Sequence, residues 1–127
     1  MSSIKDAAKS LREGFLVAFP TETVYGLGAD ATNEKAVSRI FEIKGRPLDH
    51  PVIVHLSSID QIEQWAVNVP TYAYTLAEKY WPGPMTLLLN RSSSAKDWIT
   101  GGQNTVGIRI PNHEITLSLL EEFRKIG

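Results

Sequence analysis

The sequence predicts an α/β fold in which a twisted sheet, mostly parallel or mixed, is flanked by helices. Two observations lead to this prediction. Short apolar runs typical of buried strands alternate with segments whose apolar residues recur at helical spacing. The length of 127 residues suits a single domain (1–127), and 43% hydrophobic with 21% charged residues is an ordinary globular composition. Disordered, collagen-like and coiled-coil chains are therefore excluded.

The first half of the chain is expected to form a helix, a strand, a loop, a helix and a strand. Gly14 ends the first helix, and Pro20 ends the apolar run of the first strand. In the stretch that follows, apolar residues recur with neither helical nor strand spacing, which indicates a loop. Asn33 is a favourable N-cap for the second helix, and Gly45 is a suitable terminator. The expected ranges are 3–13, 15–19, 20–31, 34–43 and 51–56.

The second half continues the alternation. A capping box over residues 57–60 begins a short helix, and Pro70 opens the next one. A later polar stretch that contains glycine predicts a long loop. The expected ranges are 58–66 and 70–80 for helices, 85–89 for a strand, 91–103 for the loop, 106–110 for a strand and 114–125 for the last helix.

Several function classes are excluded by composition. The chain has no cysteine, so disulfides, cysteine nucleophiles and thiolate zinc sites are ruled out. No carboxylate cluster has metal-ligand spacing, so no metal-ligating residue is expected. A net charge of −1 from 13 basic and 14 acidic residues argues against nucleic-acid binding by bulk charge. No apolar run approaches the roughly 20 residues of a membrane span and no signal peptide is visible, so a soluble cytoplasmic protein is expected.

The segment after the first expected strand carries hydroxyl groups and glycines. Loops at the carboxyl ends of strands bind ligands in open α/β sheets. The hydroxyls of Thr21 and Thr23 and the phenol of Tyr25 suit a small polar ligand, and Gly26 and Gly28 allow close backbone approach. An ordinary turn in which the threonines cap their neighbours accounts for the same residues, and the pattern alone favours that interpretation.

A second candidate segment holds Lys44 and Arg46 with Gly45 between them, and His50 follows. A guanidinium fork beside an ammonium group suits a polyphosphate. Cations in the last turn of a helix also complement the helix dipole, which is the favoured interpretation from the residues alone.

The expected strands carry three further polar candidates. His55 shares a side of its strand with Ile53, so it lies either in a pocket at the end of the strand or hydrogen-bonded in the core, and the core histidine is the favoured interpretation. Thr105 and Arg109 lie four residues apart on an extended segment, so they project to the same face about 13 Å apart. An arginine among Val and Ile residues requires an anionic partner, either an internal carboxylate or the carboxylate of a ligand.

Five segments, in this order and spacing, resemble the YrdC-like family of threonylcarbamoyl-AMP synthases over about residues 4–127. Each segment alone is weak, whereas five with the right gaps are specific. They are Phe19-Pro20-Thr21-Glu22-Thr23-Val24-Tyr25-Gly26-Leu27, Lys44-Gly45-Arg46-Pro47, Pro51-Val52-Ile53-Val54-His55, Trp81-Pro82-Gly83-Pro84-Met85-Thr86 and Val106-Gly107-Ile108-Arg109-Ile110-Pro111.

The resemblance implies a wide cationic cavity and a reaction in which L-threonine, bicarbonate and ATP yield threonylcarbamoyl-adenylate and pyrophosphate. The product serves the threonylcarbamoylation of adenosine 37 in tRNA, so the tRNA-modification machinery is an expected partner. ATP is a substrate in this scheme, with Mg²⁺ expected beside it. The implied catalytic residues are Lys44 and Arg46, the implied threonine contacts are Thr23, Tyr25, His55 and Arg109, and the implied ATP contacts are Lys44, Arg46, His50 and Thr105.

The sequence departs from the family pattern at its end. Family members continue with a Ser-x-Asn motif and further ATP-binding residues, whereas this chain ends at Gly127. C-terminal strands are therefore expected to be missing, and catalysis by this chain is expected to be weak or absent. Two other functions stay open: an RNA-binding module for tRNA or double-stranded RNA, and an inactive paralogue that keeps only its interactions.

Overall fold

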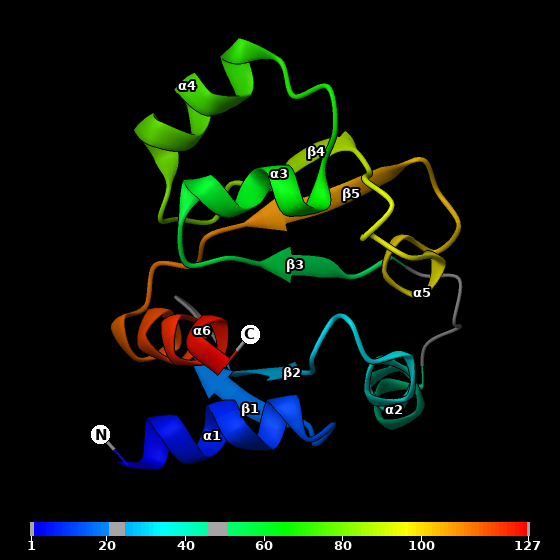
Figure 1. Ribbon diagram of the computed structural model, residues 1–127, viewed down its shortest axis with the longest axis vertical. Coiled ribbons are helices and arrows are strands. Elements are labelled where there is room, and N and C mark those ends of the chain that lie inside the picture. Colours follow the sequence, from blue (N-terminus) through cyan, green and yellow to red (C-terminus); the bar gives the residue numbers. More distant parts are fainter. Residues whose placement is uncertain (1, 21–24, 46–50, 127) are drawn as a thin grey trace.

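The computed structural model describes residues 2–20, 25–45 and 51–126 (Figure 1). Helices and strands alternate along most of the chain. In order, the elements are α1 (Ser2–Arg12), β1 (Val17–Pro20), β2 (Tyr25–Gly28), α2 (Glu34–Lys44), β3 (Ile53–His55), the 3-10 turn η1 (Ile59–Gln61), α3 (Ile62–Trp65), α4 (Thr71–Tyr80), β4 (Leu87–Asn90), α5 (Asp97–Thr100), β5 (Thr105–Arg109) and α6 (Glu114–Ile126).

One part of the molecule, here called the sheet region, consists of β3, β4 and β5 with α3, α4 and α5. The strand order is β3-β5-β4, with β3 parallel and β4 antiparallel to β5. Helices α3 and α4 lie over one face of this sheet (Figure 1). The strand residues on that face are buried with the two helices in one hydrophobic cluster, in which Ile108 and Ile62 are both 0% exposed. The expected mixed α/β sheet flanked by helices is confirmed.

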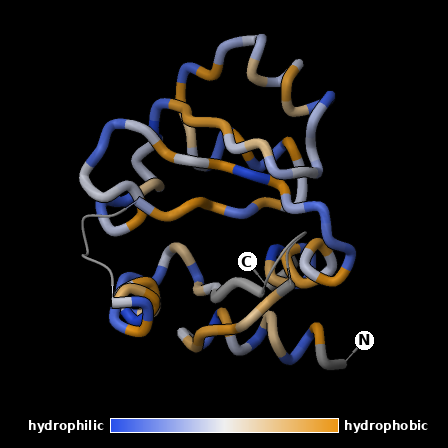
Figure 2. Tube along the Cα trace, turned by 180° about the vertical axis from the view of Figure 1, so that it is seen from behind, coloured by the Kyte–Doolittle hydropathy of each residue, from blue (hydrophilic) through white to orange (hydrophobic). Residues whose placement is uncertain are grey.

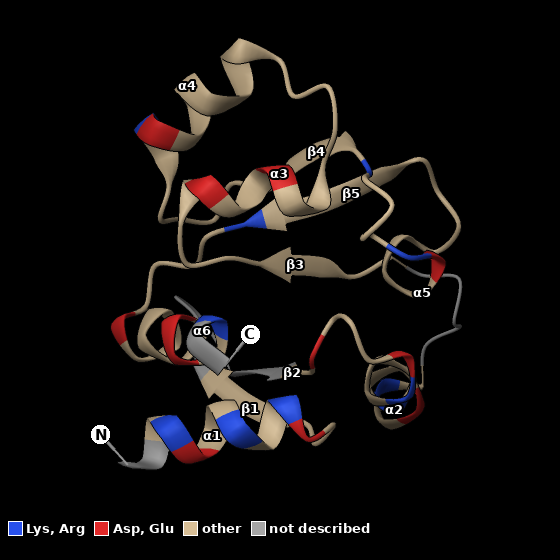
Figure 3. Cartoon of the chain, in the orientation of Figure 1, with Lys and Arg blue, Asp and Glu red and all other residues tan. Residues whose placement is uncertain are grey.

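The other part, here called the hairpin region, consists of α1, α6 and the antiparallel pair β1–β2. Helices α1 and α6 pack side by side beneath the sheet region (Figure 1). The buried cluster described here is small, made of Ala8, Leu11 and Leu119. Figure 3 shows that many charged residues belong to helices, including α1, α2 and α6. Charged residues on a helix are typical of the polar face of an amphipathic helix.

Two expected loops contain regular structure. Strand β2 lies in the stretch 20–31, where glycines hid the alternation of a strand, and its pairing with β1 supplies the structure. Helix α5 lies in the stretch 91–103 and has only four residues, too few for a helical period to show in the sequence. Both loop predictions are therefore wrong at these residues.

The predicted ends of the second helix are confirmed. The Asn33 side-chain oxygen accepts a hydrogen bond from the Ala36 N–H at 3.1 Å. Gly45 takes the left-handed conformation with φ of 65°, which glycine adopts without steric cost. Lys44 consequently occupies the last turn of α2. Within the described part of the chain, no helix is both long and apolar enough to cross a membrane.

Candidate functional site

The face of the sheet opposite α3 and α4, here called the outer face, carries the polar candidates. Strand pairing aligns three rows across it, Asn90 with Thr105, Leu88 with Gly107 and Ile53, and Arg109 with His55. Seen from behind in Figure 2, none of the described helices crosses this face. Ile53 is 46% exposed and Leu88 is 71% exposed, although both are large apolar residues. Exposed apolar residues beside polar groups are typical of a binding surface.

His55 and Arg109 are neighbours at one end of the outer face. Parallel pairing of β3 and β5 puts them directly in register, although 54 positions separate them in the sequence. The His55 ring meets the Phe19 ring edge-on, with 5.7 Å between centroids, and its Nδ1 lies 3.2 Å from the Ile53 carbonyl oxygen. His55 is half-buried. The interpretation of His55 as a core histidine is therefore wrong.

Arg109 is oriented by a backbone group of the Trp81–Pro84 segment. Its Nε donates a hydrogen bond to the Gly83 carbonyl at 2.9 Å. The Gly83 N–H in turn donates to the Ile110 carbonyl at 2.9 Å, which joins this turn to the end of β5. A Cβ at Gly83 would lie 2.6 Å from the Tyr80 carbonyl oxygen, so only glycine fits. The Trp81–Pro84 motif was visible in the sequence. That its Gly83 carbonyl binds Arg109 is evident only in three dimensions.

Thr105 lies at the other end of the outer face. It begins β5, pairs with Asn90 and is half-buried. Because β5 runs regularly from Thr105 to Arg109, the two side chains point the same way, about 13 Å apart. The outer face thus has a histidine–arginine end and a threonine end.

A cavity of about 700 Å³ lies between β3, α2 and the hairpin region. Lys44, which is exposed, and His55 both line it, so the structure brings these two predicted residues to one cavity. Much of the wall is apolar, including Phe19 and Phe123. A pocket with an apolar wall and a few polar groups is the usual form of a small-molecule site.

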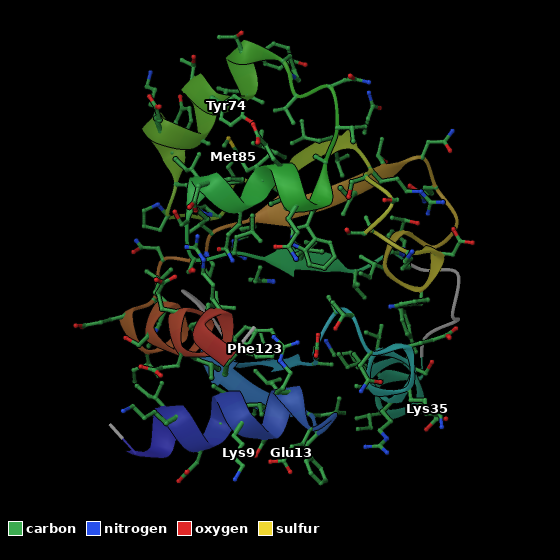
Figure 4. The ribbon with its side chains drawn as sticks, viewed as in Figure 1. Lys9, Glu13, Lys35, Tyr74, Met85 and Phe123 are labelled. Atoms are coloured by element: carbon green, nitrogen blue, oxygen red, sulfur yellow. The ribbon has the colours of Figure 1, made fainter. Side chains whose placement is uncertain are left out.

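Charged groups in this cavity are partly paired. Arg12 Nη1 lies 3.2 Å from Asp30 Oδ2, and the Arg12 guanidinium stacks over the Phe123 ring at 4.2 Å. Phe123 projects from α6 (Figure 4). Arg124 also lines the cavity, and its hydrogen bond with Asp60 raises the pKa of Arg124 above its ordinary value. Three cations, Arg12, Lys44 and Arg124, thus line the described wall of the cavity, and two of them, Arg12 and Arg124, are paired with carboxylates.

The remaining predicted residues are placed in part or not at all. Thr23, Arg46 and His50 lie outside the described residues. Tyr25 begins β2, where its backbone pairs with Pro20. Within the described ranges, no three His, Asp or Glu side chains gather as a metal site.

These features define a class of protein: an α/β domain in which polar side chains gather on an uncovered sheet face beside a cavity. A family model narrows this class. The Sua5/YciO/YrdC model, described by the words "Telomere recombination", matches residues 9–126, which is most of the chain. The chain belongs to this family.

Individual relatives agree with the family assignment. The chain is 56% identical over 118 residues to a threonylcarbamoyl-AMP synthase of Pyrococcus abyssi (strain GE5 / Orsay), covering 93% of this chain and 35% of the relative. It is 36% identical to a synthase of the same name from Halorhodospira halophila (strain DSM 244 / SL1), covering 94% of this chain and 63% of that one. The chain therefore spans about a third to two thirds of the length of these relatives.

A solved structure, that of P. abyssi Sua5 complexed with L-threonine, is also similar. The TM-score is 0.93 at 54% identity, over 97% of this chain and 36% of that one. The arrangement of the elements is therefore shared with that part of the solved protein.

Proposed function

We propose that this chain carries the threonine and ATP sites of a threonylcarbamoyl-AMP synthase that acts in tRNA modification in the cytoplasm. L-threonine, bicarbonate and ATP would give threonylcarbamoyl-adenylate, pyrophosphate and water. The observation that carries the proposal is the register of the outer face, which sets His55 beside Arg109 and leaves Thr105 on the same face. The relatives' name and the threonine complex of the similar structure support it.

In the threonine site, the guanidinium of Arg109 would pair with the substrate carboxylate. Arg109 Nε donates to the Gly83 carbonyl, which orients the guanidinium, a group whose planar fork suits a carboxylate. His55, in register beside it, would contact the same threonine, with Thr23 and Tyr25 as further proposed contacts. In this proposal the ligand carboxylate is the anionic group that Arg109 binds, one of the two kinds of partner that the sequence allows.

In the ATP site, Thr105 and His50 would contact the nucleotide, and Lys44 and Arg46 would neutralise charge on its phosphates. Bicarbonate loses hydroxide to give CO₂, and the threonine amine attacks the CO₂ carbon, so that the N–C bond of a carbamate forms as one C=O π bond opens. The proton released by the amine leaves with the hydroxide as water. A carbamate oxygen then attacks the α-phosphorus, and the bond from that phosphorus to the pyrophosphate oxygen breaks. Positioned cations lower the barrier by stabilising the negative charge that builds on the phosphates.

We propose Mg²⁺ as a companion of ATP rather than as a resident metal. The described residues offer no cluster of acidic or histidine ligands for it. Bound to the nucleotide, it would supply charge neutralisation on the phosphates. No step above depends on a protein-held metal. In this proposal the cations that the chain itself supplies to the phosphates are Lys44 and Arg46.

Pyrophosphate release tests the proposal, with L-threonine, bicarbonate and ATP each omitted in turn. We expect release that is weak but needs all three, and a KM for threonine raised at least about tenfold in Arg109→Gln. Arg39→Gln is the matched control, because Arg39 is an exposed arginine on α2 that donates to the Gly14 carbonyl.

Two other outcomes would contradict the synthase activity. Threonine and ATP binding without turnover would indicate an inactive family member that interacts with the tRNA-modification partners. RNA binding that weakens steeply with salt and ignores threonine would indicate an RNA-binding module instead.

A further inference from the structure

Residues 101–104 connect α5 to β5 and bring Thr105 to the outer face. Gly101 and Gly102 in this turn have positive φ, 63° and 80°, a conformation that glycine adopts without steric cost. Thr105 then begins β5 and pairs with Asn90, the last residue of β4. The position of Thr105 therefore depends on how this turn is held at its two ends.

Arg91, which directly follows β4, holds both ends of the turn. Its backbone N–H donates a hydrogen bond to the Asn104 carbonyl at 3.0 Å, one residue before Thr105. Its guanidinium Nη1 donates to Thr100 Oγ1 at 2.7 Å and to Asp97 Oδ1 at 2.8 Å, both on α5. A single residue thus contacts the helix before the turn and the last residue of the turn.

The two acceptors of the Arg91 guanidinium differ in burial. The Asp97 side chain is 76% exposed, whereas Thr100 is 1% exposed. An ion pair with an exposed carboxylate contributes little to stability, because water competes for both groups. A hydrogen bond from a charged group to a buried hydroxyl contributes more, because no water replaces it when it is lost. The bond to Thr100 is therefore the main link between Arg91 and α5.

Helix α5 is also anchored independently of Arg91. The Val52 N–H donates to the Ile99 carbonyl at 2.8 Å, which attaches α5 to the residue before β3. Trp98 Nε1 donates to the Ala31 carbonyl at 2.9 Å, and Ile99 is 0% exposed. Without the guanidinium, α5 would keep these anchors, whereas the end of β4 and the turn beside it would lose their fixed distance from α5.

We infer that Arg91 is a positioning residue for the ATP site, which acts on Thr105 through the turn 101–104. This inference rests on the proposed function, in which Thr105 contacts ATP. A guanidinium suits this task, because its planar donors hold two acceptors in a fixed geometry. Arg109, the proposed threonine contact, lies at the other end of β5, about 13 Å from Thr105 along the strand. A change at Arg91 should therefore weaken ATP binding and spare threonine binding.

Two variants test the inference, Arg91→Met and Thr100→Val. Arg91→Met keeps an unbranched apolar side chain and removes the guanidinium, whereas Thr100→Val removes only the hydroxyl that accepts from it. Arg39→Met is the matched control, because Arg39 is an exposed arginine on α2 whose Nη1 donates to the Gly14 carbonyl. The melting temperature and the separate affinities for ATP and for L-threonine are measured on each protein.

The expected results separate positioning from folding. Arg91→Met should bind ATP at least about tenfold more weakly, because a small displacement of a binding group is costly. Its threonine affinity should change by no more than about twofold, because distant sites without shared partners are nearly independent. Thr100→Val should weaken ATP binding in the same way, and the double variant should bind ATP no more weakly than Arg91→Met, since both changes remove the same bond. Arg39→Met should leave both affinities unchanged.

Two outcomes would overturn the inference while leaving the proposed function intact. One is unchanged ATP affinity in Arg91→Met and Thr100→Val. The other is an equal loss of ATP and threonine affinity, which would show that Arg91 serves only the stability of the sheet region. If Arg91→Met does not fold, Thr100→Val decides between these results. If the unaltered chain does not bind ATP, the proposed function is contradicted and the inference falls with it.

Discussion

The sheet region and the hairpin region differ in how completely they bury their apolar residues. In the sheet region, strand residues and the helices α3 and α4 share one extensive buried cluster. In the hairpin region the described buried cluster consists of Ala8, Leu11 and Leu119, and partly exposed residues such as Phe19 and Phe123 surround it. The cavity of about 700 Å³ lies between the two regions.

This difference assigns separate tasks to the two regions. The well-packed sheet holds Thr105, Arg109 and His55 at set positions along paired strands, and rigid elements position binding groups more accurately than loops do. The hairpin region supplies an apolar wall opposite β3, including Phe19 against the His55 ring. A wall that is only partly packed leaves room for a ligand, at the expense of stability.

Core truncations should reveal the largest difference between the regions. Ile108→Ala removes a side chain with no exposure from the centre of β5 and should cost near the top of a roughly 2–5 kcal/mol range. Leu119→Ala should fall near the bottom of that range, because Leu119 already borders the cavity and makes fewer contacts there. The free energy of unfolding is measured by chemical denaturation. Equal losses in the two variants would contradict the difference in packing between the two regions.

Gly83→Ala should come next, because it strains the turn that orients Arg109. The added Cβ meets the Tyr80 carbonyl oxygen at 2.6 Å, and overpacking of this kind costs about 1–3 kcal/mol. Threonine affinity should fall with it, since the carbonyl that holds Arg109 Nε must move. Gly107→Ala is the matched control for stability, and a Gly83→Ala protein as stable as that control would show that the turn adapts freely.

Arg12 on α1 forms an ion pair with the buried Asp30, which follows β2. Asp30 is 4% exposed and also accepts hydrogen bonds from the N–H and hydroxyl of Thr32. Asp30→Ala should cost about 1–3 kcal/mol, because it removes the shared acceptor of these part-buried donors. Asp97→Ala, which removes an exposed partner of Arg91, should stay within about 0.5 kcal/mol in the same thermal melts. Similar losses of stability in Asp30→Ala and Asp97→Ala would show that the burial of Asp30 does not strengthen its ion pair.

The smallest effect concerns the link between the two regions at Asp60 and Arg124, whose side chains lie 2.8 Å apart. Hydrogen bonds from Ser58 and then Arg124 lower the pKa of Asp60 below its ordinary value. Its contribution to stability is therefore complete above about pH 4 and is lost as the pH falls through the folded-state value.

Asp60→Asn should remove this part of the acid sensitivity. Its melting temperature should fall less between pH 7 and pH 3 than that of the unaltered chain, by a modest margin because the pair is exposed. In Arg124→Gln, the fall in melting temperature between pH 7 and pH 3 should be partly reduced. An identical acid dependence in all three proteins would contradict a role for this pair in linking the regions.

Local signals in the sequence predicted most of the elements correctly. Asn33 and Gly45 bound α2 as predicted, because caps act through hydrogen bonds to neighbours only a few residues away. Strand β2 was not predicted, because its two glycines interrupt the alternation of apolar and polar residues that marks a strand. Pairing with β1 stabilises it instead. Helix α5 escaped because four residues cannot display a period.

The candidate site shows the same division between local and distant information. The chemistry of His55, Arg109, Thr105 and Lys44 was visible in the sequence, because charge, hydrogen-bonding capacity and strand alternation belong to the residues themselves. Which of them lie together depended on the pairing of β3 with β5 and on the cavity beside the hairpin region. The contact of the Gly83 carbonyl with Arg109 also arises only from packing. Contacts between residues tens of positions apart are decided by the tertiary structure, because no local pattern encodes which distant backbone a side chain will meet.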